Sequence, residues 1–367
     1  MTSTVDQDAE ELRKALAQQL IDFGHLADPA WIRAFEEVPR HLFVPHFYRQ
    51  GPDGTQERVS GDDPVRAEEW LTAVYQNRPL VTHLIHGNAA SSSSQPSVMA
   101  VMLEALDVRE GMRVKEIGTG TGYNAGLLCH RLGDGNVVSV DVDAAVATAA
   151  RERLANAGYR PTVITGDGAG SHQPDPARQF DRIIATCGLS RIPTAWLREL
   201  ATGGSIVAPL GSGLAVVNHQ GSGRFLASPA YFMPLRAAGE SGVVRRPPLP
   251  EGETRPSAVP VEVIADEDFR FLVSIAVPNL GWQYGFGDDG KPASARLWSA
   301  DGSIAEVRDD GGVLEGGPRQ LWTELEIAYR IFTRHDRPAR DRFGITIDQG
   351  SQRVWLDHPD SGPSWAL

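Results

Sequence analysis

Between residues 97 and 235, apolar segments of strand length alternate with helical segments, and this alternation constrains the fold more than any other feature. The strand-like segments are RVKEIG (113–118), NVVSVDV (136–142), PTVITGD (161–167), DRIIAT (181–186) and SIVAPLG (205–211). Helical segments stand between several of them, including 144–157 and 193–200. Strands that alternate with crossover helices form a parallel, doubly wound sheet, so the sequence predicts an α/β fold here.

The flanking regions have different patterns. Residues 1–80 begin with two amphipathic helices and continue through a polar, Gly- and Pro-containing stretch at 50–69, which we interpret as an exposed loop. A hairpin is expected at 214–229. After residue 257, β-rich runs around Asp-Gly turns and an amphipathic helix indicate an α+β appendage with its own core. We therefore predict a helical and substrate-loop region (1–80), a binding domain (81–235), a linker (236–256) and an appended substrate-recognition domain (257–367).

Charge and cysteine content restrict the partners and the compartment. The formal net charge of −12 disfavours nucleic acid, whose phosphates repel such a surface. Two cysteines, Cys129 and Cys187, are too few for a disulfide framework and favour a reducing compartment. The N-terminal segment does not resemble a signal peptide, and no apolar run approaches the roughly 20 residues that cross a bilayer. We expect a cytoplasmic protein with no membrane partner.

A glycine-rich turn follows the first strand of the α/β region. Its sequence is Glu116-Ile-Gly118-Thr-Gly120-Thr-Gly122. Glycines there let the backbone approach a ligand closely, and the following helix N-terminus offers unpaired N–H groups. Because Gly120-x-Gly122-x-x-Ala125 also fits the dinucleotide pattern, an NAD enzyme and a tight turn without any ligand are alternatives at this point.

Three acids narrow these alternatives. Glu116, Asp141 and Asp167 all fall near carboxyl ends of predicted parallel strands, where open α/β sheets bind ligands. Asp141 is placed to accept hydrogen bonds from both ribose hydroxyls, and Asp167 to accept one from an adenine amino group. The sulfonium and amino groups of S-adenosylmethionine attract acids, whereas a dinucleotide pyrophosphate repels them. The set therefore favours S-adenosylmethionine.

Several motifs then follow in a familiar order. They are VPRHLFVP (38–45), SQP (94–96), EIGTGTGY (116–123), GDG (166–168) and PTAWLRELATGGSIVAPLG (193–211). Over roughly residues 10–235 the chain resembles the protein-L-isoaspartate O-methyltransferase family. The resemblance implies a Rossmann-like class I methyltransferase sheet that binds S-adenosyl-L-methionine. The cofactor-binding residues it implies are Glu116, Gly118, Thr119, Gly120, Gly122, Asp141, Val142, Asp167 and Gly168.

The resemblance also assigns the substrate side. Ser94 matches the active-site serine of the family, and we expect its neighbours Ser92 and Ser93 to contact the substrate. An aspartyl or isoaspartyl carboxylate is already ionised at neutral pH and attacks the sulfonium methyl in line, so that positioning and desolvation supply the rate. The alternative interpretation of the serines at 91–94 is a flexible loop. No metal site is expected, because His83 and His86 have no third ligand nearby.

Four features depart from the family pattern. They are the dense hydroxyls at 89–94, the long stretch at 50–80, residues 236–367, for which we expect no counterpart, and Lys115 at a strand position that is usually apolar. These departures resemble a branch that matures ribosomally made peptides such as lanthipeptides and graspetides. In that branch a normal aspartate is methylated and its ester collapses to an aspartimide, which can hydrolyse to isoaspartate.

Three hypotheses follow from the sequence. The main one is an enzyme that esterifies an aspartate of a modified precursor peptide. The alternative is repair of isoaspartyl residues in damaged proteins, which uses the same catalytic residues. The third, from another class, is a catalytically silent peptide-binding protein on the same fold, which the intact glycine-rich turn disfavours.

Overall fold

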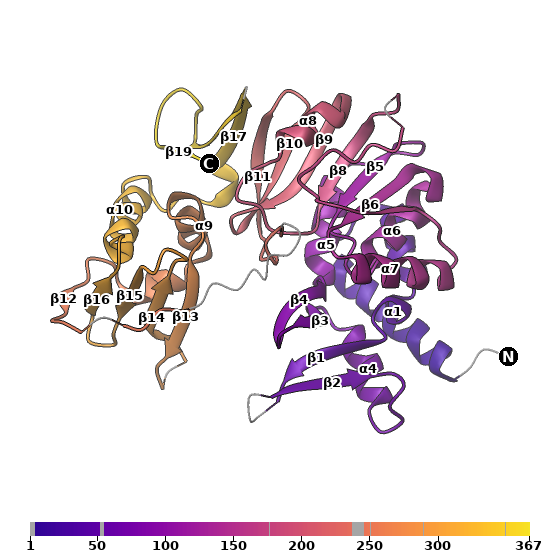
Figure 1. Cartoon of the computed structure of the whole chain (residues 1–367), viewed down its shortest axis with the longest axis horizontal. Helices are drawn as coiled ribbons and strands as arrows, with labels where there is room; N and C mark the ends of the chain where they lie inside the picture. Colours follow the sequence, from indigo (N-terminus) through magenta and orange to yellow (C-terminus); the bar gives the residue numbers. More distant parts are fainter. Residues whose placement is uncertain are drawn as a thin grey trace.

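The computed structural model describes residues 4–51, 55–175, 177–236, 246–249, 251–288, 290–348 and 350–367. Within these residues the strands form a ten-stranded, a five-stranded and a four-stranded sheet (Figure 1). None of the described helices is long and apolar enough to span a membrane.

The large sheet contains the predicted α/β core. Its order is β19-β18-β17-β11-β10-β9-β8-β5-β6-β7. The parallel strands are β5 (Val114–Ile117), β6 (Val137–Asp141), β7 (Thr162–Thr165), β8 (Phe180–Ala185) and β9 (Leu200–Leu210). The antiparallel strands are β10 (Gly213–Asn218), β11 (Ser222–Pro229), β17 (Phe343–Asp348), β18 (Ser351–Leu356) and β19 (Ser364–Ala366). The doubly wound parallel sheet and the hairpin at 214–229 are thus confirmed.

Helices cover this sheet on both faces, as its apolar strands require. The helices of the α/β region are α5 (Pro96–Ala105), α6 (Tyr123–Leu132), α7 (Ala144–Asn156) and α8 (Thr194–Glu199), with the short η1 (Asp134–Asn136) after α6. Alternation along β5 divides the core: Val114 packs in the cluster that holds the N-terminal helices, and Ile117 in the cluster that holds Trp196 of α8.

The N-terminal region adds helices and the four-stranded sheet. Its helices are α1 (Thr4–Asp22), α2 (Pro29–Glu37), α3 (Arg40–Phe43) and α4 (Ala67–Val74). Its strands, in sheet order, are β2 (Gln56–Ser60), β1 (His46–Gln50), β3 (Leu80–Ile85) and β4 (Asn88–Ser93). The interpretation of 50–69 as a loop was wrong for β2 and the start of α4. Polar residues dominate this stretch, but Val59 and Trp70 are buried and fix it to the core.

The appended region carries the five-stranded sheet. Its strands are β12 (Arg255–Pro256), β13 (Gly281–Phe286), β14 (Pro292–Trp298), β15 (Ile304–Val307) and β16 (Gly312–Gly316). Its helical elements are η2 (Val261–Ala265), α9 (Glu267–Ala276), α10 (Leu321–Arg334) and η3 (Arg340–Arg342). An α+β appendage is thus confirmed, although part of the predicted linker, at 237–245 and 250, lies outside the described residues.

The prediction that 257–367 has its own core was wrong in two respects. First, β17 pairs with β11, with Ser222 opposite Thr346, so the C-terminal hairpin extends the large sheet. Second, one continuous apolar cluster contains Trp196 of α8, Phe271 of α9 and Leu325 of α10. The sequence pattern predicts a hairpin but does not say which sheet edge the hairpin joins, because edge pairing depends on residues far away in the chain.

Candidate functional site

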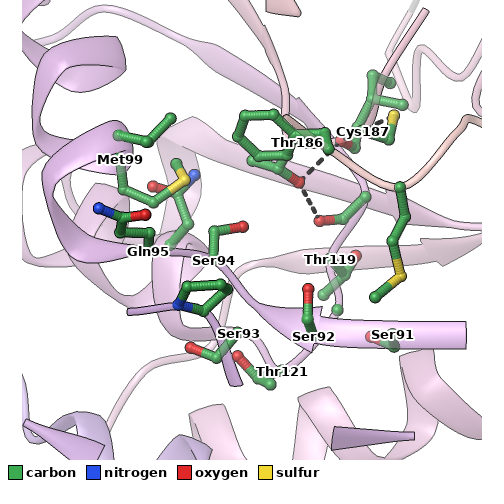
Figure 2. A pocket seen from close by; sticks show the side chains of 18 of the residues that line it. Ser91, Ser92, Ser93, Ser94, Gln95, Met99, Thr119, Thr121, Thr186 and Cys187 are labelled. Carbon is green, nitrogen blue, oxygen red and sulfur yellow. Dashed lines mark hydrogen bonds between the residues drawn. The ribbon is translucent and has the colours of Figure 1, made fainter. Parts of the chain in front are cut away.

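A cavity of about 770 Å³ opens where the carboxyl ends of β5 and β6 meet β4, a size that suits a small-molecule ligand. The turn after β5, the end of β6, β4 and the segment 231–236 form its walls. Figure 2 shows the serines of β4 on one side of this space, with Thr119, Thr186 and Cys187 on the other.

The glycine-rich turn forms a cradle that only glycine allows at its first position. Gly118 has φ +96°, and a Cβ there would lie 2.7 Å from Thr186 Oγ1. Gly120, with φ +53°, lies against the serine strand, since a Cβ would be 3.5 Å from the Ser92 carbonyl oxygen. Gly122 does not line the cavity but packs against α7. Bare backbone at Gly118 and Gly120 therefore faces the ligand space, as the motif predicts.

Glu116 is fully buried beneath this turn and orients it. Its carboxylate accepts hydrogen bonds from Asn124 Nδ2 at 2.8 Å and Ser139 Oγ at 2.5 Å. Ser139 Oγ also lies 2.6 Å from Thr119 Oγ1, which ties the turn to β6. Burial is the largest cause that raises the pKa of Glu116, to about 7. Asn124 Oδ1 is buried without a hydrogen-bond partner in the described structure, which leaves an acceptor for a donor group of a ligand.

The pKa of Glu116 predicts a pH-dependent stability difference. The folded protein holds the proton more tightly than the unfolded chain, whose ordinary value is 4.5. Stability therefore falls as pH rises from about 4.5 to about 7, by on the order of 3 kcal/mol. Glu116→Gln removes this titration. Urea unfolding between about pH 5 and about pH 8 should show that the free energy of unfolding of the wild type falls relative to that of the variant as pH rises. A difference that is constant with pH would contradict the assignment.

Asp141 at the end of β6 presents a carboxylate to the cavity. Oδ2 accepts from the Gly120 N–H at 2.9 Å and Oδ1 from the Asp143 N–H at 3.0 Å. Each oxygen retains a further lone pair, so that the pair of oxygens can still accept two hydroxyl groups. Burial is the largest cause that raises the pKa of Asp141, while these backbone bonds oppose it. Val142 follows in the cavity wall.

Of the two predicted cofactor-binding residues in the turn after β7, one lines the cavity and the other does not. Gly168 lines the cavity, and its carbonyl oxygen accepts from Trp196 Nε1 at 2.8 Å. Asp167 is exposed and does not line the cavity; its Oδ1 accepts from the Ala169 N–H at 2.9 Å. The predicted contact of Asp167 with an adenine group therefore stays a prediction.

Lys115, which the sequence left unexplained, anchors this same turn. Its Nζ lies 2.5 Å from Glu199 Oε2, and both side chains are buried. Glu199 Oε1 accepts from Ser171 Oγ at 2.7 Å and from the His172 N–H at 2.8 Å. The ion pair therefore connects β5, the end of α8 and the segment that follows Gly168.

The serines belong to a strand and not to a flexible loop. Ser92 and Ser93 are in β4, and Ser94 follows its last residue. Figure 2 shows the hydroxyls of Ser92 and Ser94 directed toward the cavity. Ser93 is directed the other way, because successive side chains of a strand alternate, and its Oγ accepts hydrogen bonds from Arg40. The structure therefore places Ser92, Ser93 and Ser94 in the cavity wall, but the Ser93 hydroxyl is bonded to Arg40.

The Arg236 side chain contributes a positive charge to the cavity wall. Arg236 is the only Arg or Lys among the described residues that line the cavity, whose acids are Glu116, Asp141 and Glu267. Its Nη2 donates to the Ala90 carbonyl oxygen of β4 at 2.9 Å. The preceding segment is held by the Gly188 N–H, which donates to the Met233 carbonyl oxygen at 2.8 Å. Sequence reasoning missed Arg236, because no motif marks a residue that crosses the cavity from a distant segment.

Comparisons with known proteins agree with this geometry. The family model for protein-L-isoaspartate(D-aspartate) O-methyltransferase matches residues 58–227. The protein-L-isoaspartate O-methyltransferase of Ignicoccus hospitalis is 33% identical over 203 residues, covering 55% of this chain and 82% of that protein. That of Methylorubrum populi is 33% identical over 238 residues, covering 62% of this chain and 97% of that protein.

A solved structure extends the likeness in fold. A protein-L-isoaspartate O-methyltransferase structure superposes with a TM-score of 0.55 at 21% identity, covering 94% of this chain and 100% of the other. The match reaches far beyond Arg236, so the expectation that residues 236–367 have no counterpart was wrong in fold. That expectation rested on sequence motifs, which end near residue 211.

Proposed function

This chain belongs to the protein-L-isoaspartate O-methyltransferase family, and we propose that it methylates the free carboxylate of isoaspartyl residues in proteins or peptides. As a member it is an S-adenosylmethionine-dependent protein carboxyl O-methyltransferase. The observation that supports the proposal best is the cavity itself, where Ser94 and Ser92 face a glycine cradle flanked by Asp141.

The residues present suit the cofactor. Because Gly118 and Gly120 have no side chains, a ligand can lie directly against their backbone atoms. Asp141 offers two acceptors to a pair of ribose hydroxyls. The unpartnered Asn124 Oδ1 offers an acceptor to an amino group. S-adenosylmethionine supplies an electrophilic methyl group when it is bound.

The chain's own part in the reaction is to position groups and to exclude water. The substrate carboxylate is ionised at neutral pH, so no general base is needed. Ser94 would donate a hydrogen bond to one of its oxygens, which would leave the other oxygen free to take the methyl group that bound S-adenosylmethionine would supply. Arg236 offsets the negative charge that enters a cavity already lined by acids. The methyl ester then loses methanol when the next backbone nitrogen attacks, leaving a succinimide.

Maturation of a ribosomally made peptide remains the second candidate. The dense hydroxyls of β4 and the reach of the appended α9, whose Glu267 lines the cavity, favour a wide substrate groove. The family relatives carry names that describe isoaspartyl substrates, which favours the repair role. In both roles we propose that the appended region, predicted at 257–367, contributes to substrate recognition.

One pair of peptides separates the two roles. An isoaspartyl peptide and its normal aspartyl isomer are incubated with the enzyme and S-adenosylmethionine, and mass spectrometry follows the methyl gain and the later loss of methanol. Isoaspartyl repair predicts methylation of the isoaspartyl form alone, in many sequence contexts. Methylation of a normal aspartate would instead support peptide maturation. Methylation of neither would contradict the proposed function.

We expect Ser94→Ala to slow methyl transfer by roughly one order of magnitude or more, because it removes one hydrogen bond to a charged group. Cofactor affinity should change little, since Ser94 lies on the substrate side. Steady-state kinetics and calorimetry measure the two effects. Wild-type turnover in a variant with alanine at all four positions 91–94 would remove the strand from catalysis.

A further inference from the structure

The motif VPRHLFVP contains a buried cation that the proposed reaction does not use. Arg40 is the first residue of α3, and its side chain is fully buried. A buried guanidinium is costly unless each of its donors finds an acceptor. Every hydrogen-bond acceptor that the structure gives Arg40 is a carbonyl or hydroxyl oxygen, and desolvation lowers its pKa to about 10.

The acceptors come from two segments, and the second of them lines the cavity. The first is the end of α4 and the loop after it, where Nη1 donates to the Val74 carbonyl oxygen at 2.7 Å. The second is the end of β4, where Nη2 donates to the Ser94 carbonyl oxygen at 3.1 Å and to Ser93 Oγ at 3.2 Å. Nε also lies 3.3 Å from Ser93 Oγ. One side chain thus clamps the strand end against the loop.

The same guanidinium also approaches the cofactor side. Its central carbon lies 5.8 Å from the ring centroid of Tyr123, the first residue of α6. Tyr123 directly follows Gly122 of the glycine-rich turn. Arg40 therefore lies between the serine strand and the turn that cradles the cofactor.

Ser94 depends on the contacts of Arg40 because it lies beyond the last hydrogen-bonded pair of strands β3 and β4. The last paired residues of β3 and β4 are Leu80 and Ser93, so the sheet does not fix the residue that follows. A misplacement of about 1 Å can cost about 100-fold in rate. The direction of the Ser94 hydroxyl depends on what holds its own carbonyl and the residue before it.

We propose that Arg40 and Ser93 are positioning residues: together they hold the end of β4 so that the Ser94 hydroxyl meets the substrate carboxylate. This inference rests on the proposed function, in which Ser94 contacts the substrate. It also gives Ser93 a role different from the substrate contact expected from the sequence.

A double-mutant cycle on turnover tests the proposal. Ser94→Ala removes the hydroxyl itself, and Ser93→Ala removes only its support. Because Ser93 acts through Ser94, we expect Ser93→Ala to lower kcat by about ten-fold and to add little in the Ser94→Ala background. Ser91→Ala is the matched control: Ser91 is on the same strand without a bond to Arg40, so its effect should multiply with that of Ser94→Ala. Calorimetry should find cofactor affinity unchanged in Ser93→Ala.

A second pair of variants separates positioning from packing. Ser93→Thr and Ser93→Val have the same shape, but only threonine keeps the acceptor for Arg40. We expect Ser93→Thr to retain a kcat about ten-fold above that of Ser93→Val. The comparison needs no change at Arg40, whose own replacement risks failure to fold.

The outcomes are distinguishable. Multiplying effects of Ser93→Ala and Ser94→Ala, or equal kcat in the threonine and valine variants, would overturn the inference and leave the role of Ser94 intact. Unchanged turnover in Ser94→Ala would overturn both the substrate contact and the inference built on it.

Discussion

Replacing Glu199 with leucine is expected to lower the free energy of unfolding by roughly 3–5 kcal/mol, because Lys115 is then left buried without its counter-ion. The two side chains are 0% and 3% exposed, and Nζ lies 2.5 Å from Oε2. Desolvation is the largest cause that lowers the pKa of Lys115, and Glu199 opposes it. Few surface substitutions have an effect of this size.

Two further variants, Lys115→Leu and the double variant, test whether Lys115 and Glu199 act as a coupled pair. Lys115→Leu leaves the carboxylate buried, although Ser171 and the His172 N–H still donate to it, so a smaller loss is expected. The double variant Lys115→Leu/Glu199→Leu removes both charges. Since a buried ion pair is often replaceable by apolar groups, its loss should be smaller than that of Glu199→Leu alone. Denaturant unfolding measures all three, and additive losses would contradict a coupled pair.

Glu199→Gln adds information about the site. It keeps an oxygen that can accept from Ser171 and His172 but removes the charge that pairs with Lys115. Comparison with Glu199→Leu therefore separates the charge pair from the support of the turn that follows Gly168.

Asp141→Ala should weaken S-adenosylmethionine binding by roughly one to two orders of magnitude. A hydrogen bond to a charged group contributes about 1.5–3 kcal/mol, and each 1.4 kcal/mol is about ten-fold in affinity. The substitution also removes the acceptor of the Gly120 N–H, which lies 2.9 Å from Oδ2, so that the cradle itself loses an anchor. Isothermal calorimetry with S-adenosylmethionine measures the change.

Asp143→Ala is the matched control for Asp141→Ala. Asp143 caps α7, where Oδ1 accepts from the Ala145 N–H at 2.9 Å and the Val146 N–H at 3.1 Å. Its loss should cost about 1 kcal/mol of stability, with cofactor affinity nearly unchanged. Equal weakening in both variants would mean that Asp141 acts only through local structure, and unchanged affinity in Asp141→Ala would exclude its contact with the ribose.

Much of the cofactor half of the site was predictable, because it is encoded locally. Gly118 and Gly120 follow a strand at a spacing that makes a tight turn, and Asp141 ends the next strand. The carboxyl ends of adjacent parallel strands meet at one edge whatever the rest of the chain does. Asp167 also stands at a strand end, but it does not line the cavity, and its contact with an adenine group stays a prediction.

The chain's own residue patterns thus determined the doubly wound sheet and the glycine cradle, whereas the resemblance to the family singled out Ser94. Only the tertiary structure decided that Ser93 turns to Arg40, 53 positions away, that Lys115 pairs with Glu199, 84 positions away, and that β17 joins β11. Periodicity and turn chemistry act over a few residues, so a sequence displays them directly. The partner of a buried charge or of an open sheet edge is selected by desolvation and packing across the whole core, and these act between residues that have no fixed spacing.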